Sequence, residues 1–476
     1  MTKPRRTKSE GTQKAPRAPK PEAPFERDRR DSVPHQRSQE NEVPAEVSPP
    51  PREPGPNLGA AAGAMVSRRA ANRLRSGHVW VYASDIESLN FPDSPGDGPP
   101  RLLPVADNRG LLLGTALYSP SSQIALRLVS GEAIDEPAWL QLLESRLRAA
   151  IARRLPLLQD TKALTDSCRL CFSEADELPG LVIDKYAGLI VLQLLVRGLD
   201  SPAVRDACVR VLRETLKPSA IVERPDPRMR ELEGLSAPAA APLWMRKGAE
   251  MPTTAEFHLN GLIFCFDADA GQKTGAFLDQ RANYEMARQW AWILAPGGRA
   301  LDVCCYQGGF ALHLAGVSKS VTGIDTSRAS LEVAERNLAA NREVNRDKLT
   351  AEVDWVEGDA FQVLRDWSDS GEKFDSIVLD PPAFAKTHKA VEAALRGYKE
   401  LNLRAFKMLR PGGLLVTCTC SHHVGWADFE AAIASAAADA HRRVRLLERR
   451  GAAPDHPVVL NIPETEYLKC LVLEVE

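Results

Sequence analysis

Two cysteines, a serine and two histidines close an apolar run in the segment LLVTCTCSHHV, residues 414–424. The run predicts a buried strand that ends at the protein surface, because apolar residues stop where polar ones begin. Cys418, Cys420, His422 and His423 at such a strand end are compatible with four roles: packing, metal binding, a disulfide or a reactive thiol. The elements around them must distinguish the four.

Composition argues against two of these roles. The chain has 476 residues and nine scattered cysteines, whereas disulfide frameworks are typical of short secreted chains. Cys168 and Cys171 form the only CxxC motif, and no second pair follows, which gives a zinc site little support. No apolar run approaches the roughly 18–20 residues that cross a bilayer. We therefore expect a protein of the reducing cytoplasm, with no membrane partner and no bound metal.

The first half of the chain shows three patterns. Residues 1–64 are rich in Pro, Arg, Lys, Glu and Ser, which predicts a disordered tail. Residues 65–135 carry the runs HVWVYASDI, LLPVADNRG, LLLGTALYS and IALRLVSG behind a basic helical turn, which predicts a β-rich domain. Residues 136–269 open with an amphipathic helix over 137–158. The strands CRLCFSE, LIVLQLLV, AIVER and LIFCFDA then predict a small α/β domain.

From residue 270 onwards, strands alternate strictly with helices. The predicted strands are ALDVCC (300–305), SVTGID (320–325), VDWVEG (353–358), DSIVLD (375–380), LLVTCTC (414–420) and two last ones near 442–449 and 467–475. This alternation is typical of a mostly parallel sheet with helices on both faces. Ligands of such sheets bind at the carboxyl ends of the strands, and the polar motifs fall at these ends.

Glycine or aspartate follows three successive strands. Gly308 and Gly309 form a turn that lets the backbone approach a ligand, and the helix behind it offers free N–H groups. Asp325 can accept both hydroxyls of a ribose, and Asp359 suits an adenine amino group. Each aspartate is alternatively a helix N-cap. Because the turn is not GxGxxG, the three positions together predict an adenosine-bearing cofactor rather than a dinucleotide.

The fourth strand runs into DPPAF, residues 380–384. Two prolines stiffen this loop without needing backbone donors and hold the carboxylate of Asp380 and the ring of Phe384 over the pocket. A hydrogen bond to the base edge and a stacking surface are what a flipped nucleobase requires. The alternative is a strand stopped by proline, with Phe384 in the core.

These motifs resemble class I S-adenosylmethionine-dependent methyltransferases, and more narrowly the bacterial family of the large-subunit ribosomal RNA cytosine-carbon-5 methyltransferase I. The resemblance also rests on HVWVY (78–82), ELPGLVIDKY (177–186), GQKTGAFLDQR (271–281) and DHPVVLNIPETEYLK (455–469), and it covers residues 65–476. It implies a PUA-type RNA-binding domain at 65–135 and a small central α/β domain at 136–269. At 270–476 it implies a Rossmann-like methyltransferase domain with a seven-stranded, mostly parallel sheet.

The resemblance also implies ligands. S-adenosylmethionine is the implied cofactor, large-subunit ribosomal RNA is the implied partner, and a homodimer is a possible assembly. With the glycine turn and the strand-end acids, the cofactor-binding candidates are Lys273, Phe277, Asp279, Arg281, Asp302, Tyr306, Gly308, Gly309, Asp325, Asp359 and Asp380. The RNA-binding candidates are Arg68, Arg69, Arg73 and Arg75 of the basic turn. Asp279 is alternatively a purely structural helix start.

Cys420 then has a chemical role. Carbon 5 of a cytosine is a weak nucleophile, and a thiolate that adds to carbon 6 converts the ring into an enamine. Cys420 ends the fifth strand beside Asp380 at the end of the fourth, so we interpret it as the nucleophile, with Asp380 and Phe384 holding the base. Cys418 lies two residues back on the same strand, and we expect it to be a small core residue. DPPAF has no second cysteine, so the base that releases the product is unidentified.

Two other functions stay open. One is transfer to a nitrogen of a purine in ribosomal RNA, because loops of the type D-P-P-aromatic also serve N-methyltransferases and that chemistry needs no thiol. The other is a non-catalytic RNA-binding assembly factor that keeps a vestigial fold.

Overall fold

The computed structural model describes residues 63–91, 101–160, 164–238, 241–249, 254–267, 275–344 and 349–476. All of them belong to one unit of the chain, Pro54–Glu476. Residues 1–62 of the predicted tail and the predicted cofactor residue Lys273 lie outside the described residues. The predicted end of the tail at residue 64 is wrong, because residues 63 and 64 already belong to the first strand.

The first sheet is six-stranded. Its strands are β1 (Gly63–Val66), β2 (Trp80–Tyr82), β3 (Ile86–Asn90), β4 (Leu102–Asp107), β5 (Leu112–Tyr118) and β6 (Ile124–Ser130), in the order β2-β6-β5-β4-β1-β3, and α1 (Arg68–Arg75) follows β1. Strands β2, β4, β5 and β6 lie in the predicted apolar runs. The sequence does not single out β1 and β3, because GAMV and IESLN are short and only partly apolar.

The second sheet is five-stranded and packs against the long helix α2 (Glu136–Gln159). Its strands, in spatial order, are β11 (Trp244–Met245), β10 (Ala220–Glu223), β9 (Leu189–Leu194), β8 (Leu181–Tyr186) and β7 (Cys168–Phe172), with α3 (Pro202–Leu216) between β9 and β10 and α4 (Pro227–Leu232) after β10. β8 is missing from the prediction because Asp184 interrupts its apolar run. An ion pair of 2.7 Å with Arg169 of β7 neutralises that carboxylate inside the sheet.

The run LIFCFDA forms a strand as predicted, but its assignment to the second sheet is wrong. It forms β13 (Leu262–Asp267), which pairs with β12 (Thr254–Leu259) in a separate two-stranded sheet. An apolar run of this length indicates a strand but carries no information about its neighbour.

The third sheet has the predicted seven strands. They are β14 (Arg299–Val303), β15 (Ser320–Asp325), β16 (Glu352–Glu357), β17 (Phe374–Leu379), β18 (Leu409–Thr419), β19 (Val444–Arg450) and β20 (Lys469–Val475), in the order β16-β15-β14-β17-β18-β20-β19. β20 pairs antiparallel with both β18 and β19, and the other neighbouring strands pair in parallel, which confirms the mostly parallel arrangement. The strand order reverses between β14 and β17, the place where such sheets bind ligands.

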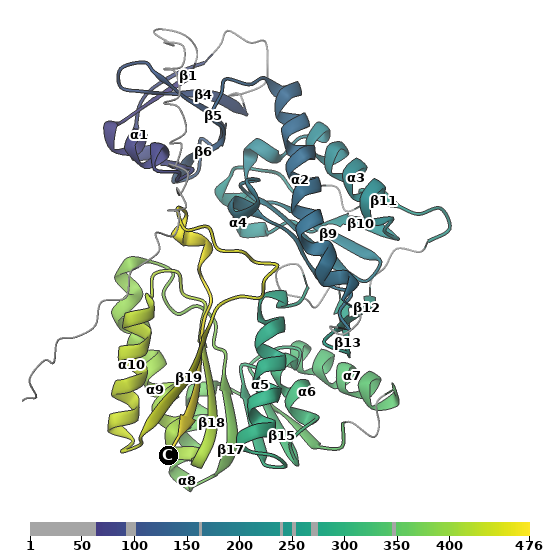
Figure 1. Ribbon diagram of the computed structural model, residues 1–476, viewed down its shortest axis with the longest axis vertical. Helices are drawn as coiled ribbons and strands as arrows, with labels where there is room; N and C mark the ends of the chain where they lie inside the picture. The colour runs from purple at the N-terminus through teal and green to yellow at the C-terminus, as the bar shows by residue number, and fades with distance from the viewer. Residues whose placement is uncertain are drawn as a thin grey trace, which may run out of the picture. The chain divides into compact units, whose positions relative to one another are not determined.

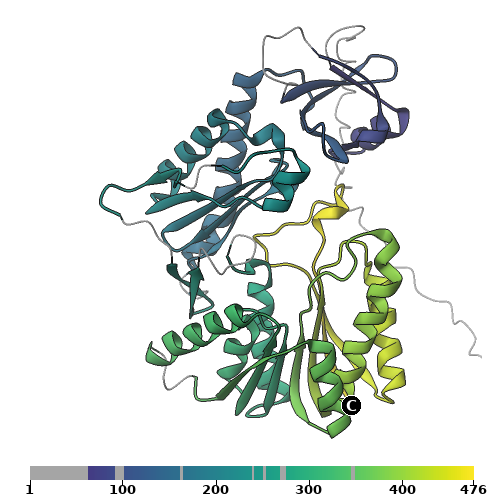
Figure 2. The same ribbon diagram turned by 180° about the vertical axis from the view of Figure 1, so that it is seen from behind.

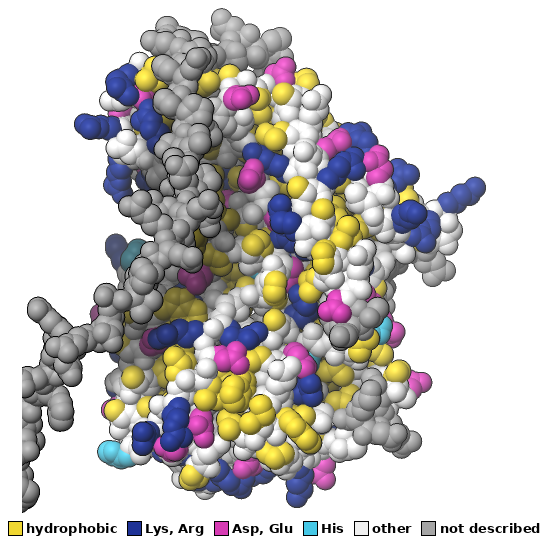
Figure 3. Space-filling model, in the orientation of Figure 1, with side chains coloured by type: hydrophobic (Ala, Val, Ile, Leu, Met, Phe, Trp, Pro, Cys, Tyr) yellow, Lys and Arg dark blue, Asp and Glu magenta, His cyan; other side chains and the backbone are white. Residues whose placement is uncertain are grey.

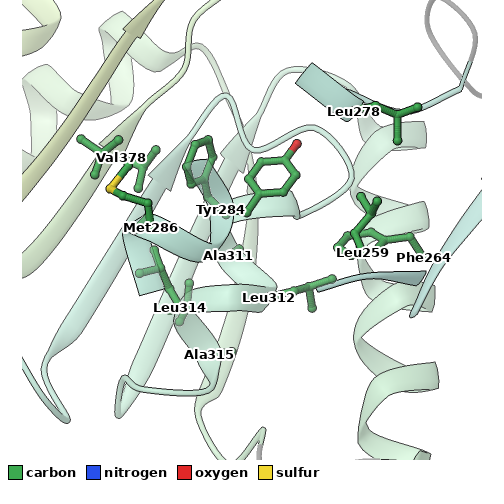
Figure 4. Close-up of a cluster of buried hydrophobic side chains, with 14 of the residues drawn as sticks. Leu259, Phe264, Leu278, Tyr284, Met286, Ala311, Leu312, Leu314, Ala315 and Val378 are labelled. Atoms are coloured by element: carbon green, nitrogen blue, oxygen red, sulfur yellow. The ribbon is translucent and has the colours of Figure 1, made fainter. Parts of the chain in front are cut away.

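Helices cover both faces of the third sheet (Figure 1 and, from behind, Figure 2). One face carries α5 (Arg281–Leu294), α6 (Gly309–Ala315) and α7 (Arg328–Val344), and the other α8 (Ala360–Ser370), α9 (Val391–Met408) and α10 (Trp426–Asp439). Successive residues of β18 point alternately to these layers, so that Val416 and Cys418 pack with α5 and Leu415 packs with α9. Figure 4 shows Tyr284 and Met286 of α5 among the buried hydrophobic side chains on the α5 face of the sheet.

The described surface is charged. On the face drawn in Figure 3, Lys and Arg side chains lie among Asp and Glu side chains rather than in one continuous basic field. Among the described helices, none has the length and apolar character needed to cross a bilayer.

Candidate active site

A cavity of about 290 Å³ lies at the carboxyl ends of β14, β15, β16, β17 and β18. Each of these strands is followed by residues that line it. The predicted site residues in its lining are Phe277, Asp279, Tyr306, Gly309, Asp325, Asp359, Asp380, Phe384 and Cys420. The fold therefore brings predicted cofactor residues and predicted catalytic residues to the same cavity.

Arg281, Asp302 and Gly308 are not part of the cavity lining. Arg281 is buried and pairs with Asp455 at 3.0 Å. Asp302 lies behind the glycine turn, where one carboxylate oxygen accepts a hydrogen bond of 2.8 Å from the Ala311 N–H. The positions of Arg281 and Asp302 thus favour support of the cavity walls over direct contact with a ligand.

The turn after β14 has a strained backbone. Cys304, Tyr306 and Gly308 have φ angles of 62°, 49° and 83°, in the left-handed region that side chains rarely adopt. Strain of this kind clusters at binding sites. The neighbouring glycine has a packing reason as well, because a Cβ on Gly309 would lie 2.4 Å from the ring of Tyr284. Packing of aromatic side chains behind the turn, and not ligand approach alone, requires the glycine.

Asp325 and Asp359 end β15 and follow β16 with their carboxylates held by backbone donors. Asp325 accepts hydrogen bonds from the N–H groups of Tyr306 and Ser327, both at 2.9 Å. Asp359 caps α8 by accepting from the Gln362 N–H at 3.0 Å, so its alternative role as a cap is real. Both carboxylates also line the cavity, and each oxygen has a second lone pair for a ligand donor.

The cavity is acidic. Its lining contains the aspartates 279, 325, 359 and 380 and, among the described residues, no lysine or arginine. Burial above all, together with the charges of Asp380 and Asp325, raises the pKa of Asp302 behind the turn to about 8. Asp302 is therefore largely protonated at neutral pH. The negative potential of the four lining aspartates favours a positively charged ligand and disfavours one that carries phosphates.

Cys420 and Phe384 lie where the loops after β18 and β17 meet. Cys420 is half-buried, and its Sγ is 4.0 Å from the carbonyl oxygen of Pro381. Phe384 is also half-buried, with its ring centroid 4.8 Å from that of Tyr398 and 5.7 Å from that of Phe361. It both packs against the core and lines the cavity, so the two interpretations of Phe384 hold together.

A buried hydroxyl network joins these two loops. Thr419 Oγ1 donates to the Tyr398 hydroxyl at 2.7 Å, and that hydroxyl lies 2.9 Å from Ser421 Oγ. Ser421 Oγ in turn accepts a hydrogen bond of 3.1 Å from the Ala385 N–H. All of these hydroxyl-bearing side chains are fully buried. Tyr398 of α9 thus holds the residues on both sides of Cys420, and Ser421 ties them directly to Ala385, the residue after DPPAF.

Other thiols near the cavity are poor nucleophiles. Burial raises the pKa of the Cys304 and Cys305 thiols, and the surrounding aspartate charges raise it further, so both stay protonated. Cys418 is fully buried and faces Cys470 across the β18–β20 pairing, which confirms the expected core role. Within the described ranges, no group of three or more His, Cys, Asp or Glu side chains is arranged to hold a metal ion.

Two parts of the site are not found by sequence reasoning. Phe361 lines the cavity and packs against Phe384. Its signal, an aromatic residue two positions after the strand-end Asp359, is present but easily overlooked. The hydroxyl of Tyr467 donates to the carboxylate of Asp279, a contact between segments almost two hundred residues apart that no local pattern reveals.

The predicted RNA-binding arginines of α1 differ in their surroundings. Arg73 and Arg75 pair with aspartates of the same sheet region, at 2.8 and 2.6 Å. Arg68 and Arg69 are exposed and make no ion pair with any described residue. The geometry therefore leaves Arg68 and Arg69 accessible to a phosphate, whereas the other two have internal partners.

Comparison with known proteins gives the family. Residues 171–472 match a family model described as S-adenosylmethionine-dependent methyltransferase, and residues 65–131 match one for a PUA-like domain. The Ribosomal RNA large subunit methyltransferase I of Erwinia tasmaniensis is 36% identical over 396 residues, which is 82% of this chain and 94% of the relative. That of Shewanella amazonensis is 37% identical over 402 residues, 84% of this chain and 95% of the relative. The chain belongs to this family.

A solved structure has the same fold. SMU.776 in complex with SAH aligns with a TM-score of 0.70 at 20% identity and covers 87% of this chain and 100% of that one. Membership of the family makes this protein an S-adenosylmethionine-dependent methyltransferase with a PUA-like domain before its catalytic part. The predicted fold class, cofactor and class of enzyme are thereby confirmed.

The first prediction concerns the hydroxyl network of this methyltransferase. Tyr398→Phe removes the hydroxyl that holds Thr419 and Ser421 on both sides of Cys420 and leaves these buried partners unsatisfied, which costs about 1–3 kcal/mol of unfolding free energy. We expect kcat to fall by roughly 10- to 100-fold, because small misplacements of reacting groups have effects of that size, whereas affinity for S-adenosylmethionine stays the same. Tyr118→Phe, at a buried tyrosine of the first sheet, is the matched control. A Tyr398→Phe variant with full kcat would contradict the positioning role.

The second prediction concerns pH. His313 of α6 is buried, donates from Nδ1 to the Gly309 carbonyl at 2.7 Å and accepts at Nε2 from Asn260 at 3.1 Å. Burial lowers its pKa to about 4. The unfolded chain takes up this proton near pH 6.5 and the folded one only near pH 4, so the histidine's contribution to stability is lost as pH falls through this window.

Between pH 7 and pH 5 this histidine should reduce the unfolding free energy by about 2 kcal/mol, measured by urea denaturation. His313→Gln should show a smaller loss over the same interval, and the control His441→Asn, at an exposed histidine, should behave as the wild type. An unchanged pH dependence in His313→Gln would show that the histidine does not resist protonation.

Proposed function

We propose that this methyltransferase forms 5-methylcytosine in large-subunit ribosomal RNA through a transient bond between Cys420 and the base. The observation that carries the proposal is the meeting of Cys420, Asp380 and Phe384 at one cavity. The relatives named Ribosomal RNA large subunit methyltransferase I match over 94% and 95% of their own lengths, which supports ribosomal RNA as the substrate.

The residues of the cavity fit S-adenosylmethionine. Its acidic lining suits the positive sulfonium and ammonium groups. Asp325 and Asp359 would bind the ribose hydroxyls and the adenine amino group, and Phe361 would offer an apolar face to the adenine ring. When bound, the cofactor supplies the electrophilic methyl group.

Cys420 would make carbon 5 of the cytosine reactive. Its thiolate forms a bond to carbon 6, and ring electrons move towards carbon 5. In its protonated form, taken up when the base is bound, Asp380 gives a proton to ring nitrogen 3, which neutralises the charge entering the ring. Once carbon 5 has taken the methyl group, its hydrogen leaves as a proton to a base. The sulfur–carbon bond then breaks, the Cys420 thiolate leaves, and the proton on nitrogen 3 returns to Asp380.

The surroundings of the cysteines support this choice of nucleophile. Burial keeps the thiols of Cys304 and Cys305 protonated, and Cys418 is enclosed in the core. Cys420 is the cavity thiol that adjoins the DPPAF loop. Transfer to a purine nitrogen, the main alternative, needs no thiol and so does not explain why Cys420 lies beside the DPPAF loop. A non-catalytic assembly factor would have no cofactor for the acidic cavity to bind.

The RNA would be held by more than the flipped base. Phe384 offers a stacking face, and Arg68 and Arg69 of the PUA-like domain are accessible for phosphate contacts. With ribosomal RNA as the proposed substrate, we expect the reaction to take place in the cytoplasm. Association into a homodimer remains a separate prediction.

The third prediction tests the nucleophile. Cys420→Ala should lower the formation of 5-methylcytosine by a factor on the order of 10³ or more, because alanine cannot add to carbon 6. The readout is bisulfite or mass mapping of unmodified large-subunit ribosomal RNA after incubation with enzyme and cofactor. Affinity for S-adenosylmethionine, measured by calorimetry, should be unchanged.

Cys418→Ala provides the matched control, because it removes the neighbouring thiol from the core side of the same strand. This control should keep most of the activity. Methylation of a purine nitrogen by Cys420→Ala at the wild-type rate would refute carbon-5 chemistry, and a wild-type protein that does not bind S-adenosylmethionine would revive the assembly-factor alternative.

A further inference from the structure

We infer that the loops around Cys420 form a basic rim that binds the phosphates flanking the flipped nucleotide. The basic rim consists of Lys386, His388 and Lys389, which follow DPPAF, and His422 and His423, which follow Cys420. The inference rests on the proposed function and extends it from the target base to the RNA backbone on either side.

The rim is positive because acidic residues are missing from it. Between residues 380 and 390 the only acid is Asp380, which lines the cavity, and residues 420–425 contain none. All the rim side chains are exposed. The charges of the two lysines are therefore directed to the surroundings of the cavity mouth.

The two lysines of the rim have no acidic partner among the described residues. Among the described lysines, Lys399 of the following helix pairs with Asp439 at 2.7 Å, whereas Lys386 and Lys389 make no ion pair and keep their charge available to a ligand. The mixed charges on the face drawn in Figure 3 illustrate the usual pattern on this protein. A lysine that only contributes to solubility can lie anywhere on the surface. Lys386 and Lys389, however, adjoin the loop that carries the proposed base-binding residues.

The geometry brings the rim to the cavity from two sides. The ring centroids of His388 and His423 are 5.0 Å apart. The loops after β17 and β18 are therefore in contact here as well as at the hydroxyl network close to the strand ends. Phe384 lies on one of these loops and Cys420 at the start of the other, and both line the cavity. A nucleotide turned out of its stack into such a cavity keeps its 5′ and 3′ phosphates at the mouth.

The acidic cavity and the basic rim therefore sort two ligands by charge. The cationic cofactor suits the aspartates inside, whereas RNA phosphates suit the lysines outside. Lysine contacts with phosphates release counterions, and each contact leaves a measurable trace in the salt dependence of binding.

The fourth prediction uses the double variant Lys386→Gln, Lys389→Gln. Binding of unmodified large-subunit ribosomal RNA, transcribed in vitro, is measured over a series of KCl concentrations. The slope of log Kd against log salt concentration should become shallower by about 1.4 to 1.8, because each phosphate contact contributes roughly 0.7 to 0.9. KM for RNA should rise at low salt while kcat and affinity for S-adenosylmethionine stay the same.

The control double variant Lys319→Gln, Lys407→Gln removes the same charge from two exposed lysines at the opposite edge of the sheet. Lys319 directly precedes β15, and Lys407 lies in the last turn of α9. Its salt slope should equal that of the wild type. Equal slopes for the rim variant and the wild type would overturn the inference and leave the proposed function standing. A wild-type protein that binds the cofactor but not this RNA would instead overturn the proposed function.

Discussion

A buried hydroxyl network holds the segment of Cys420 against the segment that follows Asp380, and the proposed chemistry depends on this contact. Parallel pairing of β17 with β18 brings the loops after these strands to the same edge, but loops beyond a sheet are free to move apart. Tyr398 bonds Thr419 and Ser421 at 2.7 and 2.9 Å, and Ser421 accepts a hydrogen bond of 3.1 Å from the N–H of Ala385, directly after DPPAF, which restricts that freedom. Because the network is buried, breaking one of its bonds leaves polar groups unsatisfied. The nucleophile and the base-holding loop are therefore linked through buried hydrogen bonds.

Charge divides the same edge of the sheet into two regions. Inside, aspartates at the ends of successive strands create an acidic cavity, and burial keeps Asp302 behind them largely protonated. Outside, the rim lysines face solvent without acidic partners among the described residues. A cationic cofactor and a polyanionic substrate must meet at one point, and this separation lets each approach a surface of opposite sign. Cys420 lies at the border between the two regions.

Local pattern predicted much of this architecture. The seven strands of the third sheet and the positions of Asp380 and Cys420 follow from apolar runs ended by polar residues. Contacts between distant segments did not follow. The partner of β13, the ion pair between Arg281 and Asp455, and the bond from Tyr467 to Asp279 depend on which segments the fold brings together. Gly309 was predicted as a ligand-binding glycine, yet the ring of Tyr284 behind it also forbids a side chain, a constraint that exists only in the packed molecule.

The covalent bond between Cys420 and the base is the central claim, and trapping it is the most direct test. In large-subunit ribosomal RNA with 5-fluorocytidine in place of cytidine, the carbon-5 substituent does not leave as a proton, so the sulfur–carbon bond persists. After incubation with S-adenosylmethionine, denaturing electrophoresis and peptide mass spectrometry should show an RNA adduct on the peptide that contains Cys420. An adduct on another cysteine, or none from a preparation that methylates ordinary RNA, would contradict the account.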